Sequence, residues 1–313
     1  MARRLRFIPE GGALVEVTCR TIQGRFLLKP TGELRSVVIG VLARAQRLYP
    51  VEIHAFVFLS NHYHLLVTVE NALQLARFMN YLNSNLAREA GRLNGWEERL
   101  WGRRYQAIVV SQEEASQVNR LRYLLSQGCK EGLVARPRDW PGAQSVEALV
   151  EGKRLEGLWW NRTQEYAART RGEKFDRLRY AEAERIELEA LPCWRHLSKQ
   201  EYGRRVGEVI MQIEVETAAR HRREGTRPLG VKVILAQHPH DRPHKLKKAW
   251  APAFHVATKT ALRELVEAYR WFVGAYREAA ERLREGNLGA RFPQGSFPPR
   301  LPFVGCTVEL APG

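Results

Sequence analysis

The amino-acid sequence predicts an α+β fold in which helices back an antiparallel sheet. Two kinds of segment in the first half of the chain predict this. Short runs are rich in β-branched and aromatic residues or alternate apolar with polar residues, which is typical of strands. Longer runs between them repeat apolar residues every three or four positions, which is typical of amphipathic helices. A chain of 313 residues, 44% of them hydrophobic, can bury one good core and carry a second domain or a long extension.

The first four elements follow from local patterns. Residues 13–22 (ALVEVTCRTI) alternate apolar and polar side chains, so they predict a half-buried strand. Residues 32–48 predict an amphipathic helix that stops before a proline. The runs VEIHAFVFL (51–59) and HYHLLVTVE (62–70) predict two strands joined by a short turn. The apolar stripe of the helix consists of Leu34, Val37, Val38, Val41, Leu42, Ala45 and Leu48.

Three further elements complete the first domain. A second helix runs from about Leu75 to Asn94-Gly95, where a left-handed cap is easily formed. RYQAIVV (104–110) predicts a fourth strand, and residues 113–134 predict a last helix. The order β-α-β-β-α-β is the ferredoxin-like plan, a four-stranded antiparallel sheet backed by two helices. The last helix is added to this plan, and together these elements predict a domain at residues 1–145.

The second half predicts a mainly helical, basic extension at residues 146–313, with a DNA-binding or structural role. Residues 137–180 are expected to mix loops with short helices, and 181–223 to be mainly helical with a break near Leu191-Pro192. A long amphipathic helix is expected at about 257–285, followed by a Pro-rich tail at 289–304 that wraps back along the body.

Composition points to a polyanionic partner. Fifty Lys and Arg against 34 Asp and Glu give a net charge of +16 and a pI of about 10.1, spread over both halves. Four scattered cysteines without CxxC spacing argue against a cysteine zinc site and for a reducing cytoplasm. The sequence has no apolar run of transmembrane length and no secretory signal pattern. We therefore expect a cytoplasmic, nucleoid-associated protein that contacts no membrane.

Two histidines form the first part of a candidate site. His62 and His64 occupy alternate positions of a predicted strand, so both imidazoles project from the same face. Two neutral imidazoles can share a divalent cation if a third ligand arrives from elsewhere. Taken alone, the pair is a weak signal that favours two histidines on a solvated strand face over a metal site.

The last predicted helix supplies the missing groups. Its apolar stripe is Val118, Leu121, Leu125 and Cys129, while another side carries Arg120, Tyr123, Gln127 and Lys130 at spacings of three and four. The carboxamide oxygen of Gln127 is a candidate third metal ligand. The hydroxyl of Tyr123, one turn away, is chemically suited to attack a phosphodiester beside a metal ion and cations. The structural alternative is a tyrosine that covers the sheet edge and a glutamine in water.

Three motifs in order make a resemblance specific. HAFVFLSNHYHLLV (54–67) resembles the strand-turn-strand of the REP-associated tyrosine transposases, a group of the single-tyrosine HUH nucleases, in which U is a hydrophobic residue. LNSNLAREAGRLNGWEERLWGRRYQAIVV (82–110) and YLLSQGCKEGLVARPRDWPG (123–142) resemble the two following blocks of that family. The resemblance covers roughly residues 10–145, and the region beyond resembles the extension of the long members.

The resemblance assigns roles to individual residues. His62 and His64 match the two HUH metal ligands, Tyr123 matches the nucleophile, and Gln127 matches the third ligand position, usually Asn or Gln. The chain departs from the family where it reads Gln127-Gly128-Cys129 in place of Asn-Pro-Val. The metal implied is Mg²⁺ or Mn²⁺. Tyr63, which strand alternation points to the opposite face, and Tyr105, which has no ligand at helical spacing, are weaker candidates for the nucleophile.

The implied reaction is transesterification of single-stranded DNA at the foot of a hairpin, through a 5′-phosphotyrosine and a free 3′-OH. Candidate phosphate contacts are Arg103, Arg104, Arg120, Arg122 and Lys130. One alternative is a domesticated protein that binds hairpin DNA or RNA without cutting it. Another is a metal hydrolase in which water attacks and Tyr123 is structural. The protein is expected to be a monomer or a homodimer.

His238, His240 and His244 lie in a basic, proline-interrupted stretch. Their spacing matches no established metal template, so a basic loop over DNA is the preferred interpretation.

Overall fold

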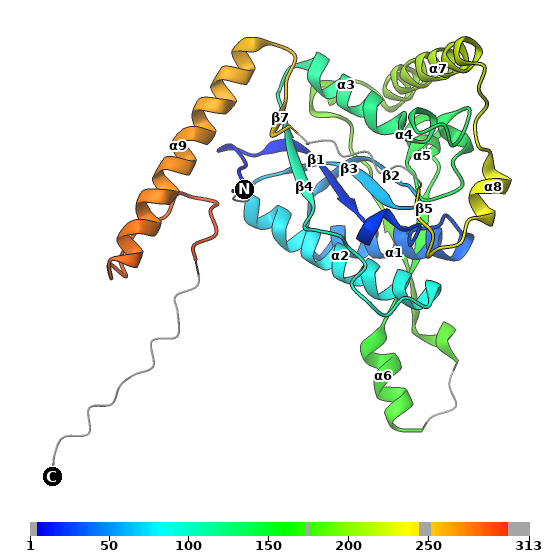
Figure 1. Ribbon diagram of the computed structural model, residues 1–313, viewed down its shortest axis with the longest axis horizontal. Coiled ribbons are helices and arrows are strands. Elements are labelled where there is room, and N and C mark those ends of the chain that lie inside the picture. The colour runs from blue at the N-terminus through cyan, green and yellow to red at the C-terminus, as the bar shows by residue number, and fades with distance from the viewer. Residues whose placement is uncertain (1–4, 173–175, 244–251, 300–313) are drawn as a thin grey trace.

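A five-stranded sheet with helices on both faces organises the computed structural model (Figure 1), which describes residues 5–172, 176–243 and 252–299. The sheet order is β2-β3-β1-β4-β7, and β1 to β4 pair antiparallel with their neighbours. With α1 between β1 and β2 and α2 between β3 and β4, this is the predicted ferredoxin-like plan, which is confirmed. These elements are β1 (Ala13–Arg20), α1 (Gly32–Leu48), β2 (Glu52–Phe58), β3 (His62–Val69), α2 (Ala72–Asn94) and β4 (Gln106–Val110).

Alternating side chains give the sheet two cores. Val15 and Val17 of β1 face α1 and α2, whereas Leu14 and Val110 face the opposite layer. That layer lies above the sheet in Figure 1 and holds α3, α4, α5 and α7. Their bounds are α3 (Glu114–Leu125), α4 (Gln127–Lys130), α5 (Val146–Glu151) and α7 (Lys199–Glu224). Residues on both sides of position 145 therefore contribute to the cores.

Caps fix the ends of the two ferredoxin-like helices. The hydroxyl of Thr31 accepts a hydrogen bond from the Leu34 amide at 3.2 Å at the start of α1. The Asn71 side chain accepts from two amides at the start of α2. Gly95 ends α2 with φ 59°, the left-handed cap that the sequence predicts.

The last predicted helix is shorter than expected and is divided. It forms α3 and α4 with Ser126 between them, and it ends at Lys130 rather than near residue 134. The physical reason is Gly132, whose φ of +69° turns the chain and lets the Leu133 amide donate to the Gly128 carbonyl at 2.9 Å.

A strand of a two-stranded antiparallel sheet, called the hairpin below although α6 (Arg162–Thr170) lies between its strands, replaces part of the expected helix at 181–223. Residues Ala181–Ile186 form β6, which pairs with β5 (Leu155–Trp160), and only Lys199–Glu224 is a long helix. Glu182 and Glu184 occupy alternate strand positions and both form ion pairs with Arg44 of α1. These tertiary contacts override the helix propensity of an Ala- and Glu-rich segment.

The remaining elements are mostly short, except for one long helix. α9 (Lys259–Arg284) confirms the long helix expected at 257–285 and extends away from the sheet in Figure 1. Its rings at Tyr269 and Phe272 pack against Phe7. The tail folds back on α9, where the Tyr276 hydroxyl donates to the Phe297 carbonyl at 3.0 Å.

The short elements are η1 (Ile22–Gly24), η2 (Pro137–Asp139), α6 (Arg162–Thr170), η3 (Arg177–Tyr180), η4 (Pro192–Trp194), α8 (Val231–Ala236) and β7 (Phe254–His255). Among the described residues, no helix combines the length and apolar character needed to span a membrane.

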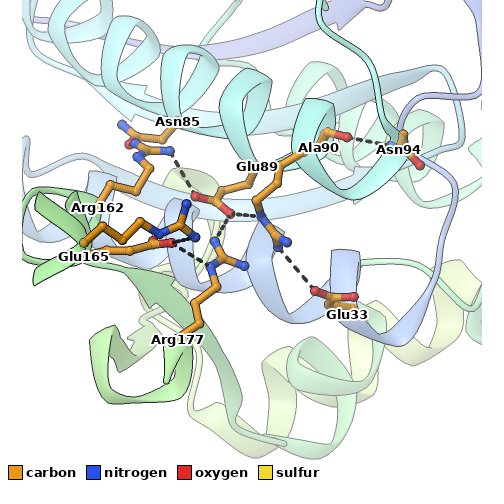
Figure 2. Close-up of polar contacts among 10 residues, drawn as sticks. Glu33, Asn85, Glu89, Ala90, Asn94, Arg162, Glu165 and Arg177 are labelled. Carbon is orange, nitrogen blue, oxygen red and sulfur yellow. Dashed lines mark hydrogen bonds and ion pairs between the residues drawn. The ribbon is translucent and has the colours of Figure 1, made fainter. Parts of the chain in front are cut away.

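An ion-pair cluster joins the hairpin region to α2 (Figure 2). The carboxylate of Glu89 is almost fully buried and receives Arg92 from its own helix, together with Arg162 and Arg177 from the hairpin region. Arg177 also reaches Glu165 at 3.5 Å. A buried carboxylate needs such partners to offset its desolvation, so this cluster ties residues 155–186 to α2.

Two glycines allow the hairpin to approach α1 closely. A Cβ on Gly40 would lie 2.3 Å from the backbone carbon of Leu158, and one on Gly157 would lie 2.2 Å from the Ser36 carbonyl oxygen.

We expect Gly40→Ala to lower the free energy of unfolding by about 1–3 kcal/mol, because the backbone of the hairpin at Leu158 must move to make room for the methyl group. Urea unfolding measures this. Gly207→Ala, with open space at its Cβ in α7, is the matched control and should stabilise. Equal stability of the two variants would contradict the close packing.

Candidate functional site

The two histidines lie side by side on β3, on the sheet face that α3 covers. Their ring centres are 5.2 Å apart, and both side chains are largely buried. The placement on one strand face agrees with the prediction from their alternate positions.

A different acceptor orients each imidazole. His62 Nδ1 lies 2.7 Å from the side-chain oxygen of Asn61, and His64 Nδ1 lies 2.6 Å from Oε1 of Glu16. With Nδ1–H donated to an oxygen, Nε2 is the ring nitrogen suited to ligate a cation. Burial lowers the pKa of His64, and the charges of Lys130 and Arg20 lower it further. His64 is therefore neutral near pH 7, the form that binds metals.

Glu16 is a site residue that the sequence analysis missed. It is the only acidic residue of β1, is fully buried, and projects to the same sheet face as His64. Its second carboxylate oxygen forms an ion pair with Arg120 of α3. One sequence signal could have found it, an acidic residue between two apolar ones, Val15 and Val17. Strand alternation places Glu16 on the same face as Thr18, and Thr18 is the residue that pairs with His64. Glu16 thus links the histidine strand to the tyrosine-bearing helix.

Two cations flank Tyr123. The Arg120 guanidinium carbon lies 4.4 Å from the centre of the Tyr123 ring, and Lys130 Nζ lies 4.2 Å from it. The half-buried Tyr123 ring is 5.7 Å from that of His64. Four predicted residues, His64, Tyr123, Arg120 and Lys130, are therefore brought together from β3, α3 and α4 of one chain. This arrangement offers a hydroxyl, an imidazole and two cations to a phosphate.

Gln127 holds a fixed orientation at the start of α4. Its side-chain nitrogen donates to the Tyr123 carbonyl at 2.8 Å, and the residue is buried. With the amide nitrogen directed to the backbone, the carbonyl oxygen is the end of the side chain suited to ligate a cation.

The other three predicted phosphate contacts lie outside this cluster. Arg122 forms an ion pair with Glu216 of α7. Arg104 lines a cavity of ≈ 350 Å³ with Arg6 and Phe272. Arg103 is exposed beside the end of β1, where its carbonyl accepts from the Cys19 thiol at 3.6 Å.

The rival tyrosines have structural surroundings. Tyr63 is fully buried on the opposite sheet face and donates to the Asn83 side chain at 2.8 Å, so it points away as predicted. Tyr105 is also buried, beneath the guanidinium of Arg6 at 4.8 Å, which leaves its ring unavailable for stacking on a base.

The remaining histidines of interest do not join the site. His54 is fully buried between the Glu189 carbonyl and the Thr68 hydroxyl, and burial lowers its pKa to about 4. The rings of His238 and His240 lie 5.0 Å apart, and His244 falls outside the described residues. Within the described ranges, no group of three or more His, Cys, Asp and Glu side chains is arranged to hold a metal. A cation site here would therefore rest on two imidazoles and a carboxamide.

Comparison with known proteins agrees with the resemblance expected from the sequence. Residues 21–127 match the family of IS200-like transposases, and this segment contains His62, His64, Tyr123 and Gln127. The resemblance to tyrosine transposases is thereby confirmed over that segment. No curated protein matches the chain.

Two solved structures are similar to part of the chain. One is a REP-associated tyrosine transposase bound to a REP hairpin, with 18% identity over 48% of this chain and 86% of that chain, at a TM-score of 0.40. The other is a candidate transposase from Deinococcus radiodurans R1, with 16% identity over 39% of this chain and 95% of that chain, at a TM-score of 0.28.

Removing the charge of Glu16 should destabilise the fold strongly. Glu16→Gln leaves the Arg120 guanidinium buried without a counter-ion, so we expect the free energy of unfolding to fall by roughly 3–5 kcal/mol. The matched control is Glu216→Gln, which breaks the more exposed pair with Arg122 and should have little effect. Denaturant unfolding of both variants measures the difference. A Glu16→Gln protein as stable as the control would contradict a buried ion pair.

Proposed function

We propose that this protein is an HUH-type endonuclease and strand transferase that cleaves and rejoins single-stranded DNA at a hairpin, with Tyr123 as the nucleophile. The observation that carries the proposal is the position of Tyr123. Its ring centre lies 5.7 Å from that of His64, and Arg120 and Lys130 lie over the ring. All of these residues except Lys130 fall inside the segment that matches IS200-like transposases. A protein that only binds hairpins has no need for this combination.

The donor set at the site fits a divalent cation. His62 and His64 each commit Nδ1 to an oxygen, and Gln127 commits its amide nitrogen to the Tyr123 carbonyl. Two imidazole nitrogens and one carboxamide oxygen would then be the ligand atoms. These side chains would hold the Mg²⁺ or Mn²⁺ that the family resemblance implies. When bound, the cation would polarise a non-bridging oxygen of the scissile phosphate.

The chain's own residues carry the bond changes. The Tyr123 oxygen attacks the phosphorus atom and its phenolic proton passes to solvent. The bond from phosphorus to the 3′ oxygen breaks, and that oxygen takes up a proton to become a free 3′-OH. The product is a 5′-phosphotyrosine, and attack by a second 3′-OH reverses the step and joins a new strand. No nucleotide hydrolysis is required, because each step exchanges one phosphodiester for another.

The surrounding groups support this step electrostatically. Arg120 and Lys130 lie within 4.4 Å of the Tyr123 ring centre, where they offset negative charge that develops on the phosphate. Glu16 acts as a positioning residue, since it holds both His64 and Arg120. Arg103, Arg104 and Arg122 remain predictions as DNA contacts, and the cytoplasmic location remains one as well.

A covalent-adduct assay tests the nucleophile. Wild-type protein incubated with labelled hairpin DNA from the sequence flanking its gene, in Mn²⁺, should give a shifted band on a denaturing gel. Tyr123→Phe should give neither adduct nor cleavage, because the attacking oxygen is gone, and chelator should suppress both. Tyr105→Phe is a matched control that should retain the adduct. Cleavage by Tyr123→Phe without an adduct would instead support attack by water, and binding without cleavage would support a hairpin-binding protein.

Mn²⁺ binding tests the ligand set independently of activity. We expect calorimetry to detect Mn²⁺ binding to the wild type and none to His64→Ala. Glu16→Gln should bind about 10–100-fold more weakly, since it weakens the group that orients His64. His196→Ala, which removes an exposed histidine elsewhere, should bind normally. Unchanged affinity in His64→Ala would contradict the assignment.

A further inference from the structure

A groove of ≈ 830 Å³ opens beside His62. The end of β1 lines it with Arg20, the turn after β1 lines it with Arg25 and Phe26, and the β2–β3 turn lines it with Asn61. Another wall comes from residues 237–243, which follow α8 and lie far outside the segment that matches the transposase family. The C-terminal region therefore reaches the candidate site.

Hydrogen bonds fix one end of this wall to the turn after β1. The Phe26 amide donates to the Asp241 carbonyl at 2.9 Å, and the Arg25 guanidinium donates to the His240 carbonyl. The ring of His240 contacts the Asn94 carbonyl through Nε2 at 2.8 Å and packs edge-on against Trp96 at 5.2 Å. The wall is thus held by several independent contacts.

The other end is attached to the loop that follows the tyrosine-bearing helices. The amides of Leu229 and Gly230 donate to the carbonyls of Gly132 and Leu133, both at 2.9 Å. Ile234 of α8 is fully buried in the core on that side of the sheet. Residues 229–243 consequently connect the loop after α4 to the turn after β1, along the groove that His62 borders.

The chemistry of the lining suits a polynucleotide strand. The lining carries more positive than negative charge. Its three arginines are Arg20, Arg25 and Arg242, and its two acidic residues are Glu131 and Asp241. Guanidinium groups bind phosphate oxygens through paired hydrogen bonds. The half-buried ring of Phe26 offers a surface on which an unpaired base can stack. A duplex keeps its base faces stacked internally, so cations together with an aromatic ring favour a single strand.

We propose that this groove binds the unpaired nucleotides that lead to the reacting phosphate, and that residues 237–243 form one of its walls. The inference rests on the proposed function, because the groove borders His62 of the reacting site. It gives the C-terminal region a direct part in holding the substrate.

Strand binding by full-length protein carrying Tyr123→Phe tests the groove without cleavage. The probe is fluorescein-labelled oligo(dT), and anisotropy is measured over a range of NaCl concentrations. In this background Arg242→Ala should lower the slope of log affinity against log salt by about 0.7, the effect of one lost phosphate contact on a single strand. Arg242→Lys should restore the slope. Phe26→Ala should weaken binding roughly fivefold or more.

The matched control is Arg270→Ala, which removes an exposed arginine from α9 and should leave both slope and affinity unchanged. Parent-like binding by both Arg242→Ala and Phe26→Ala would overturn the proposal. A preference of the parent for oligo(U) over oligo(dT) would also overturn it, with RNA as the occupant. If the wild type forms no covalent adduct but the groove variants still lose binding, the proposed reaction fails while the groove assignment stands.

Discussion

The site depends on one buried carboxylate. Glu16 lies in the middle of the sheet and is fully excluded from water, with His64 on one oxygen and Arg120 on the other. An isolated carboxylate would be costly there, so its presence requires both partners. Because His64 belongs to β3 and Arg120 to α3, this requirement fixes the tyrosine-bearing helix over the histidine strand. The position of Tyr123 follows, since Arg120 also lies against its ring.

Much of the structure of residues 13–130 could be predicted because local patterns and tertiary structure agree there. The helix expected at 32–48 has those bounds, and the pair at His62 and His64 lies on one face as the strand period requires. The tyrosine, the glutamine and the flanking cations could be grouped because helical spacing places them on one side. Glu16 was not found, because a single acidic residue in an apolar strand does not reveal which partner it meets across the sheet.

The second half was harder to predict because long-range contacts decide its structure. The segment at 181–186 has the composition of a helix, yet it forms a strand since Glu182 and Glu184 meet Arg44. The hairpin is then joined to α2 through Glu89 and two arginines, which lie more than 70 positions away in the sequence (Figure 2). Residues 237–243 also reach the groove beside His62 through long-range contacts. These are backbone hydrogen bonds, which no local sequence pattern predicts.

Mass spectrometry of the wild-type protein, after reaction with hairpin DNA and digestion by nuclease and protease, tests most directly whether Tyr123 is the nucleophile. We expect a single modified peptide in which Tyr123 carries a 5′-linked nucleotide. A nucleotide on Tyr63, Tyr105 or any residue other than Tyr123, or cleaved DNA with no modified peptide, would contradict this role of Tyr123.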